Sequence, residues 1–401
     1  MASLNENSGK YIYFDNAATS FPKPREVVDA VIEYMTQIGG NPGRSGHLLS
    51  INAGTLVFSC RETIARLFGS GNPMRVIFCS NATDALNLAI LGILKPGDHA
   101  ITTAMEHNST IRPLKELEKR MGIGLTVLAC PDRCRMDLDE FERSIRPDTK
   151  LAVINHASNV TGTLQPLREI GHMCRRKNII LLADCSQSVG TVSLDLEEYN
   201  IDILAWSGHK GLYGPTGTGG LVLSDSFDFI RMSPLKYGGT GSDSDKIFQP
   251  DFLPDAYECG TLNVAGLSGL GAGINYILSL QNGVQGIYIH KKEMAGYFVD
   301  RAVQSIGGFM NYVPPDLIET GVVSFNLRGI DPSEVVYLLS ERYNIFSRSG
   351  LHCAPLAHMT MGTYPVGTVR FSFSLFNTKD EVDFAVNALE EISFNKGVDE
   401  R

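Results

Sequence analysis

The fold is indicated most clearly by two stretches: residues 179–184 read IILLAD, and residues 203–210 read ILAWSGHK. Each stretch is apolar over several consecutive residues and then changes abruptly to polar ones. Strands whose two faces are both covered have this composition, because neither face meets water. The stretches therefore predict two buried strands of a parallel sheet, with Asp184 and Lys210 at or just beyond their carboxyl ends.

Apolar runs of the same kind recur through the first part of the chain. They occupy residues 76–79, 100–103, 151–154 and 221–223. Helical patterns such as residues 84–94 separate them, and strands that alternate with helices form a mostly parallel sheet with helices on both faces. The sequence therefore predicts an α/β fold whose site opens at the carboxyl ends of the strands.

The pattern changes after about residue 262. The elements predicted beyond it are a long helix through Leu267, Leu270 and Ile274 that continues past Ile289, strands at 322–325 and 369–372, and helices at 332–341 and from Thr378. They predict a smaller α+β domain at residues 263–401, which follows a large domain at residues 26–262.

Composition is that of an ordinary globular protein. The chain has 401 residues, of which 43% are hydrophobic and 20% charged, so we expect two or three domains. No apolar run reaches the roughly 18 residues of a membrane span, and the first residues contain no apolar signal region. A net charge of −9 argues against nucleic-acid binding. We therefore expect a cytoplasmic protein that binds neither membrane nor nucleic acid.

The eight cysteines are scattered along the chain rather than regularly spaced. This distribution argues against a secreted disulfide framework. Cys130 with Cys134, and His172 with Cys174, come nearest to metal-ligand spacing, but no second pair of ligands accompanies either, so we predict no metal site. Most of these thiols are predicted to be inert and partly buried.

An acidic residue stands at the carboxyl end of the first stretch. Asp184 directly follows the apolar residues, and Gln187 comes three residues later. A carboxylate here is a candidate site residue. Taken alone, it is better explained as the N-cap of a helix, a position that aspartate occupies well.

A lysine stands in the loop after the second stretch, in the sequence Ser207-Gly208-His209-Lys210. Desolvation and nearby positive charge would lower the pKa of its amine and make it a usable nucleophile. The alternative is a solvated loop lysine. Five glycines among residues 211–220 would let the backbone pass close to a ligand.

Two further loops follow predicted strands. Residues 80–84 read SNATD and open a helix, whose exposed backbone N–H groups form an anion site. Residues 106–108 read EHN, and His107 is a candidate functional imidazole, with a hydrogen-bonded structural histidine as the alternative.

The four loops together favour pyridoxal 5'-phosphate (PLP). This cofactor needs a lysine for a Schiff base, an acid for the pyridinium nitrogen, a phosphate cup and a group that covers the ring. Nucleotide sites are disfavoured. Residues 214–220 lack the Lys-Ser/Thr ending of a P-loop, and residues 269–273 lack the spacing of a dinucleotide fingerprint.

Three motifs resemble those of the class V aminotransferase-like family of PLP enzymes. They are residues 13–19 (YFDNAAT), residues 207–217 (SGHKGLYGPTG) and residues 348–354 (RSGLHCA). Within this family they are similar to the cysteine desulfurase and selenocysteine lyase branch. The resemblance runs from Tyr13 to Val382, with the motifs in the family's order.

The resemblance implies a fold of the PLP-dependent transferase type (fold type I). Its large domain would hold a mostly parallel, seven-stranded sheet, and residues 1–25 would pack with the small C-terminal domain. Family members are homodimers in which a loop of the neighbour completes the phosphate site. Residues 238–241 look like that loop, with Thr240 as the contact.

The resemblance also implies a role for each candidate cofactor residue. Lys210 would form the Schiff base, Asp184 would pair with the pyridinium nitrogen, and Gln187 would bond the ring hydroxyl. His107 would stack on the ring and move protons, and Asn159 would lie beside the ring. The phosphate would be bound by Ala82, Thr83, Ser207 and His209.

The implied activity is that of a cysteine desulfurase. Arg370, assisted by Arg348, would clamp the substrate carboxylate. Cys353 would take sulfur from L-cysteine as a persulfide, leaving L-alanine, and pass it to an acceptor protein or a reductant, for example in iron–sulfur cluster assembly. Positive neighbours in its glycine-containing loop favour the thiolate that this attack requires.

Two departures from the family's commoner pattern leave other activities open. Leu351 stands where histidine is usual, and residues 81–83 read NAT rather than GTT. The alternatives are a selenocysteine lyase, and a transaminase, lyase or epimerase in which Cys353 is incidental. A binding or regulatory protein without catalysis is disfavoured because Lys210, Asp184 and Arg370 are all present.

Overall fold

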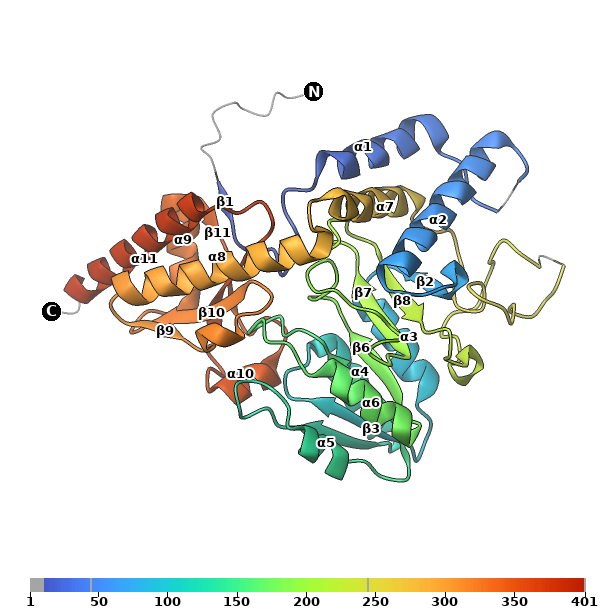
Figure 1. The fold of residues 1–401 in the computed structure, drawn as a ribbon, viewed down its shortest axis with the longest axis horizontal. Helices are drawn as coiled ribbons and strands as arrows, with labels where there is room; N and C mark the ends of the chain where they lie inside the picture. Colours follow the sequence, from blue (N-terminus) through green and yellow to red (C-terminus); the bar gives the residue numbers. More distant parts are fainter. Residues whose placement is uncertain (1–10, 44, 244, 400–401) are drawn as a thin grey trace.

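The computed structural model describes residues 11–43, 45–243 and 245–399. Its largest sheet has seven strands in the order β2-β8-β7-β6-β5-β3-β4 (Figure 1). The strands are β2 (Val76–Cys79), β3 (His99–Thr103), β4 (Gly124–Leu128), β5 (Thr149–Asn155), β6 (Ile180–Asp184), β7 (Ile203–Ser207) and β8 (Gly219–Leu223). Only β8 runs antiparallel to its neighbours, so the predicted mostly parallel sheet is confirmed.

Helices cover both faces of this sheet. Successive strand residues belong to opposite cores, as with Leu181 in one and Leu182 in the other. One core contains residues of α2 (Leu48–Leu67), α5 (Leu138–Arg143), α6 (Leu167–Lys177) and α7 (Val264–Ser279). The other contains residues of α3 (Ala82–Ile93) and α4 (Asn108–Met121). This layering explains why the strands are apolar throughout.

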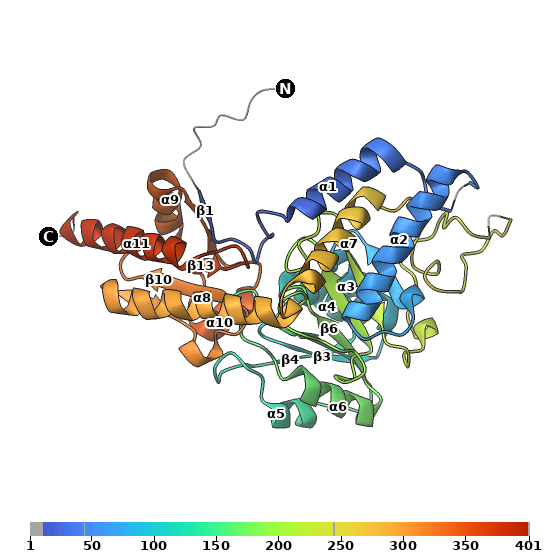
Figure 2. The ribbon, with the colours of Figure 1, turned by 45° about the horizontal axis from the view of Figure 1, so that its top comes forward.

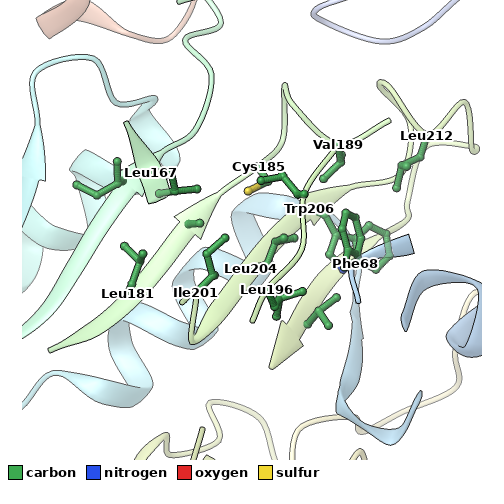
Figure 3. Packing of buried hydrophobic residues seen from close by; sticks show 14 of the residues in the cluster. Phe68, Leu167, Leu181, Cys185, Val189, Leu196, Ile201, Leu204, Trp206 and Leu212 are labelled. Carbon is green, nitrogen blue, oxygen red and sulfur yellow. The ribbon is translucent and has the colours of Figure 1, made fainter. Parts of the chain in front are cut away.

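The first of these cores lies directly under the loops that carry Asp184 and Lys210. Figure 3 shows Leu204 and Trp206 of β7 packed with side chains from neighbouring elements. Trp206 and Cys185 are fully buried. The carboxyl ends of β6 and β7 are therefore fixed by close packing against this hydrophobic core.

A second, smaller body contains most of the C-terminal part of the chain (Figures 1 and 2). Its antiparallel sheet has the order β12-β13-β10-β9, and a two-stranded sheet joins β1 to β11 in parallel. The strands are β1 (Ile12–Tyr13), β9 (Phe309–Asn311), β10 (Val322–Leu327), β11 (Ile345–Phe346), β12 (Arg348–Gly350) and β13 (Thr368–Ser372). The helices are α8 (Gly283–Ser305), α9 (Pro332–Tyr343), α10 (Pro355–Met361) and α11 (Lys379–Asp399).

Short helical segments complete the described elements. They are α1 (Arg25–Glu33), η1 (Tyr34–Ile38), η2 (Pro73–Arg75), η3 (Phe229–Arg231) and η4 (Pro315–Leu317). None of the helices in the described part of the chain combines the length and the hydropathy that a membrane-spanning segment needs.

The domain boundary at residue 262 stays a prediction. We propose that the boundary lies later in the chain, within α8. The apolar side of α7 belongs to the large core, in which Leu270 and Ile274 are fully buried. In α8, Ile287 belongs to that core, whereas Met294 belongs to the core of the small body. The small core also contains Phe14, whose ring centroid lies 4.9 Å from that of Phe371. The first ten residues lie outside the described part.

The single long helix predicted through Leu267 and past Ile289 is wrong. Two helices, α7 and α8, occupy this stretch, separated by residues 280–282. Leu280 is extended, and Asn282 has a φ of +65°, in the left-handed region that ends helices. Strand β4 and helix α5 were not predicted, because their apolar residues are few and β4 lies at the sheet edge.

A buried ion pair ties α2 to the segment before α7. Arg61 Nη1 donates to Glu258 Oε1 over 2.8 Å, and the guanidinium lies 4.4 Å from the centroid of the Phe78 ring. Arg61 also donates to the Val76 carbonyl, and the Phe78 N–H donates to Glu258. Both side chains are buried, so each charge depends on the other.

Replacing Arg61 with leucine should destabilise the protein strongly. The change leaves Glu258 buried without a cation, and breaking a buried pair on one side costs about 3–5 kcal/mol. Urea unfolding measures the loss, with Arg25→Leu as the control because Arg25 belongs to an exposed pair. Equal midpoints for the two variants would contradict the expectation. Adding Glu258→Gln to Arg61→Leu should recover part of the loss.

Candidate active site

The carboxyl ends of β5, β6 and β7 and the N-terminus of α3 surround one cavity. Its lining residues are Asn81, Ala82, Thr83, His107, Ser109, Asn155, Ala157, Asn159, Asp184, Ser186, Gln187, Ser207, His209 and Lys210. Every cofactor residue predicted from sequence is among them except Thr240. Parallel strands bring these loops together because their carboxyl ends share one edge of the sheet.

Asp184 is the last residue of β6 and is buried. Its Oδ1 accepts hydrogen bonds from the Ser186 N–H, at 3.0 Å, and from the Ser186 hydroxyl. Turns rather than a helix follow it, so Asp184 does not cap a helix. The carboxylate is therefore fixed in direction at the wall of the cavity.

Lys210 lies in the turn after β7. Residues of the N-terminal segment hold this turn through hydrogen bonds to the neighbouring His209. The carbonyl of His209 accepts hydrogen bonds from the Ser20 N–H at 3.0 Å and from Lys23 Nζ at 2.8 Å. Burial lowers the pKa of the Lys210 amine to about 8, against the opposing charge of Asp184. About a tenth of this amine is therefore uncharged and nucleophilic at pH 7, far more than for a solvated lysine.

His107 precedes α4 and is neutral at physiological pH. Burial lowers its pKa to about 4. Its Nδ1 accepts a hydrogen bond from the Ser109 N–H at 3.1 Å, which assigns the ring proton to Nε2. His107 is thus hydrogen-bonded and also lines the cavity, and its functional role stays a prediction.

The N-terminus of α3 presents backbone N–H groups to the same cavity. Asn81 is the N-cap, and its side-chain oxygen accepts from the Asp84 N–H at 2.9 Å. Ala82 and Thr83 form the first turn, where N–H groups have no partner within the helix. An anion is favoured here by these N–H groups and by the helix dipole.

Polar atoms without protein partners face this space. Asn155 Oδ1, Asn159 Oδ1 and His209 Nδ1 are buried and have no hydrogen-bond partner among the described residues. Gln187 lines the cavity and is anchored by Nε2, which donates to the Ala17 carbonyl over 2.9 Å. Buried polar atoms without partners are rare in proteins, so they indicate a polar ligand.

Arg370 approaches the site from β13 in the small body. It is 1% exposed, and its Nη2 donates to Asp15 Oδ1 over 2.6 Å. Its Nη1 donates to the Asn159 carbonyl over 3.0 Å, and its Nε has no hydrogen-bond partner in the described part of the chain. Positive charge on Arg370 and Arg348 also lowers the pKa of Lys210. Both guanidinium groups therefore contribute positive potential at the Lys210 amine.

Cys353 is exposed and stands in a strained turn. His352 and Cys353 have φ values of +48° and +59°, in the left-handed region that ordinary residues rarely adopt. Asn159 Nδ2 donates to the His352 carbonyl over 2.7 Å, and the Asn108 N–H donates to the Cys353 carbonyl over 2.7 Å. These bonds from the large domain hold the turn in place.

Arg348 provides the cation nearest to the thiol. Its Nη2 lies 3.7 Å from Cys353 Sγ. Cys353 also lines an open groove between α3 and α4, together with Thr83 and His107, which line the cavity as well. The thiol therefore lies in a groove that is linked to the cavity through shared lining residues.

Thr240 is not brought to this cavity within one chain. Its hydroxyl is 3.2 Å from that of Ser242 and does not line the site. The predicted contact across a dimer stays a prediction.

Sequence reasoning missed several residues of the site. Asp15 pairs with Arg370, and Asn155, Ser186 and Ser109 line the cavity. Asn155 ends β5 on the same edge as Asp184, so its place at a strand end was a usable signal. The pairing of Asp15 with Arg370 gave no local signal, because the two residues come from opposite ends of the chain.

Comparison with known proteins agrees with this geometry. The model of the family "Aminotransferase class-V" matches residues 12–384. The chain belongs to the class V aminotransferase family. Enzymes of the class V aminotransferase family depend on PLP, and the cavity offers an amine, a carboxylate and an anion site that fit this cofactor.

Two relatives of this chain are named as cysteine desulfurases. A probable cysteine desulfurase of Pyrococcus abyssi is 34% identical over 391 residues, 95% of this chain and 94% of the relative. A cysteine desulfurase of Haloferax volcanii is 31% identical over 396 residues, 96% of this chain and 90% of the relative.

Solved structures of class V relatives have the same fold. The apo structure of a cysteine desulfurase from Thermococcus onnurineus has a TM-score of 0.89 at 32% identity and covers 96% of this chain and 95% of its own. The cysteine desulfurase CsdA from Escherichia coli, in an S-sulfonic acid form, has a TM-score of 0.84 at 28% identity, covering 95% and 94%. The predicted fold type I architecture is confirmed.

Proposed function

We propose that this protein is a PLP-dependent cysteine desulfurase, which converts L-cysteine to L-alanine and takes the sulfur onto Cys353. One observation carries the proposal. An exposed cysteine thiol with a guanidinium 3.7 Å away lines a groove that shares Thr83 and His107 with the cavity of Lys210. The names of the relatives, at 31–34% identity over nearly the whole chain, support it.

Residues around the cavity would hold the cofactor. Lys210 would bind it covalently, Asp184 would bond the pyridine nitrogen, Gln187 the ring hydroxyl, and His107 would cover the ring. The phosphate would be bound by Ala82, Thr83, Ser207 and His209. When bound, PLP supplies an electron sink that stabilises negative charge at the α-carbon of an amino acid.

Substrate orientation would depend on Arg370. Its guanidinium is fixed by Asp15 and by the Asn159 carbonyl, while Nε has no partner among the residues that the structure describes. A fixed guanidinium binds a carboxylate with directional hydrogen bonds. Arg348 would assist, and Asn159 Oδ1 would bond the substrate or the ring. With the carboxylate fixed, the Lys210 amine would remove the α-proton.

Cys353 would then carry out the sulfur transfer. The thiolate of Cys353 attacks the sulfur of the substrate, an S–S bond forms, and the C–S bond of the substrate breaks with its electron pair returning to carbon. The products are a persulfide on Cys353 and, after protonation of that carbon, L-alanine. Arg348 favours the thiolate, because a neighbouring cation stabilises the negative sulfur.

The groove between α3 and α4 supports transfer of the sulfur to a protein acceptor. Cys353 shares it with Arg112, Leu117 and Leu91, and the groove is open to solvent. A free thiol reductant would serve in the absence of the acceptor. Iron–sulfur cluster assembly is one use for sulfur delivered in this way.

A cytoplasmic location suits this chemistry. All eight cysteines are free thiols, and Cys353 must be reduced to attack. The cytoplasm keeps thiols reduced, whereas the secretory pathway and the extracellular space are oxidising.

We also propose a homodimer. Large apolar side chains are exposed on α1 and α2 and on the segment from η3 to Phe252, among them Ile32, Leu48, Ile247 and Phe248. These two regions are adjacent, since Gly241 lies against Gly43. Exposed apolar surface of this extent indicates an interface. Thr240 lies in the same segment, which is consistent with a contact to the neighbour's phosphate.

Charging this surface should produce monomers. The double variant Ile247→Asp/Phe248→Asp places two carboxylates at positions that are 92% and 80% exposed in one chain, so the folded monomer tolerates them. We expect the mass from light scattering to fall to that of one chain. Val303→Asp, on the exposed side of α8, is the control and should remain dimeric. A double variant with unchanged mass would locate the interface elsewhere.

Product analysis tests the proposed reaction. The purified, PLP-loaded protein is incubated with L-cysteine and a reductant, and alanine, sulfide and pyruvate are quantified. Equal amounts of alanine and sulfide support the desulfurase. Formation of a keto acid without sulfide would identify a transaminase instead. In a parallel incubation with L-selenocysteine, turnover of that substrate but not of L-cysteine would identify a selenocysteine lyase.

A further inference from the structure

Glu106 is a fully buried carboxyl group hydrogen-bonded to Asn155, which lines the cavity, and the proposed mechanism does not use it. It lies between β3 and His107 and is 0% exposed. Its Oε1 accepts from the Thr103 hydroxyl at 2.8 Å and from the Asn155 N–H at 2.9 Å. Its Oε2 has no hydrogen-bond partner among the described residues.

No cation compensates this carboxyl. The other fully enclosed glutamate, Glu258, has Arg61 beside it, whereas no ion pair in the described part of the chain includes Glu106. The titratable groups that face it are Asp184 on β6 and the Cys130 thiol, and a negative charge on either opposes a charge on Glu106. Burial and Asp184 raise the pKa of Glu106 to about 8.

Asn155 connects this carboxyl to the cavity. Its N–H is bound by Glu106, and its Nδ2 donates to the Met105 carbonyl over 2.8 Å. Its Oδ1 is buried, and no residue that the structure describes donates to it. Asn155 lines the cavity and is paired in register with Asp184 on the adjacent strand. Glu106 Oε2 and Asn155 Oδ1 are thus two buried acceptors, on residues in direct contact, that lack a donor.

We propose that Glu106 is a positioning residue. It is a neutral carboxylic acid whose Oε2–H donates a hydrogen bond to Asn155 Oδ1. In this form it fixes the wall of the cavity beside Asp184 without adding charge. Asp184 is then the only carboxylate at this end of the site among the described residues that line it. A second negative charge there would compete with Asp184 for the pyridinium proton. The proposal rests on PLP binding and not on the identity of the sulfur substrate.

Glutamine is the matched substitution for a protonated glutamate. In Glu106→Gln, the side-chain oxygen can accept from Thr103 and Asn155, and the NH₂ group can donate where the acid proton stands. Glu106→Ala removes both functions. Glu116→Gln, on the surface side of α4, controls for removal of a glutamate elsewhere.

Infrared spectroscopy tests the protonation directly. The wild-type protein at pH 7 should show the carbonyl stretch of a protonated carboxylic acid, which Glu106→Gln should lose and Glu116→Gln should keep. Absence of a band specific to Glu106 at pH 7 would overturn the proposal.

Cofactor binding and thermal unfolding test the positioning role. At pH 7 we expect Glu106→Gln to bind PLP within twofold of wild type, measured by visible absorbance, and Glu106→Ala to bind at least tenfold more weakly. A loss in Glu106→Gln as large as in Glu106→Ala would overturn the role. PLP binding is measured without desulfurase activity. The role of Glu106 can therefore be tested even if the proposed reaction is not found.

The pH dependence of stability has a definite sign. A buried acid whose pKa rises from 4.5 to about 8 costs the folded state stability as pH rises, because the unfolded chain ionises above 4.5. The melting temperature of Glu106→Gln relative to wild type should therefore increase between pH 5 and pH 8. A difference that stays constant over this range would contradict a protonated Glu106.

Discussion

Lys210→Ala should lose alanine formation by about 10⁴-fold or more, since the variant lacks both the covalent anchor and the base. Lys23, a second lysine near this turn, is bound to the His209 carbonyl, so its amine is engaged elsewhere. PLP should bind without a covalent link, so its visible absorbance should change and the cofactor should be lost on dialysis. Single-turnover assays measure the rate.

Lys95→Ala, an exposed lysine in a turn, is the matched control and should retain full activity. Activity in Lys210→Ala within tenfold of wild type would contradict the role of the amine.

The same lysine predicts a pH dependence for cofactor loading. Only the uncharged amine reacts with an aldehyde, and burial gives Lys210 a pKa of about 8. The rate at which the apo protein binds PLP covalently should rise about tenfold per pH unit below 8 and level off above it. A rate that continues to rise past pH 10 would indicate a solvated lysine instead.

Cys353→Ala should abolish sulfide release and sulfur-linked alanine formation, by about 10³-fold or more, while leaving PLP bound. The side chain is exposed, so removal of the thiol has little effect on packing. The measurements are alanine and sulfide yields, with the bound cofactor followed by absorbance. Cys259→Ala, a partly buried cysteine outside the cavity, is the control.

Alanine formation undiminished in Cys353→Ala would contradict the proposed attack of this thiol. It would favour a class V reaction in which Cys353 has no part.

Much of the cofactor site was predictable because it depends on local sequence and one topological rule. Residues 179–184 are apolar up to Asp184, so the strand and the place where it ends could both be read. Parallel strands end on a common edge, and this rule placed Lys210 and His107 beside Asp184 before the structure was known. The structure gathers all three around one cavity.

The sequence did not reveal how the small body completes the site. Arg370, Asp15 and Asn159 come from three distant parts of the chain, and their hydrogen bonds form only when the two bodies pack together. No periodicity or composition records such a contact. The resemblance suggested Arg370 but gave no reason for its orientation.

What the sequence by itself determined is the order of buried strands and the reactive side chains at their ends, because burial on both faces selects apolar residues locally. Tertiary structure alone decided the strained turn at Cys353, the protonation of Glu106 that we propose and the break between α7 and α8. These features depend on which groups meet after folding, and pKa values and backbone strain are set by such neighbours rather than by adjacent residues.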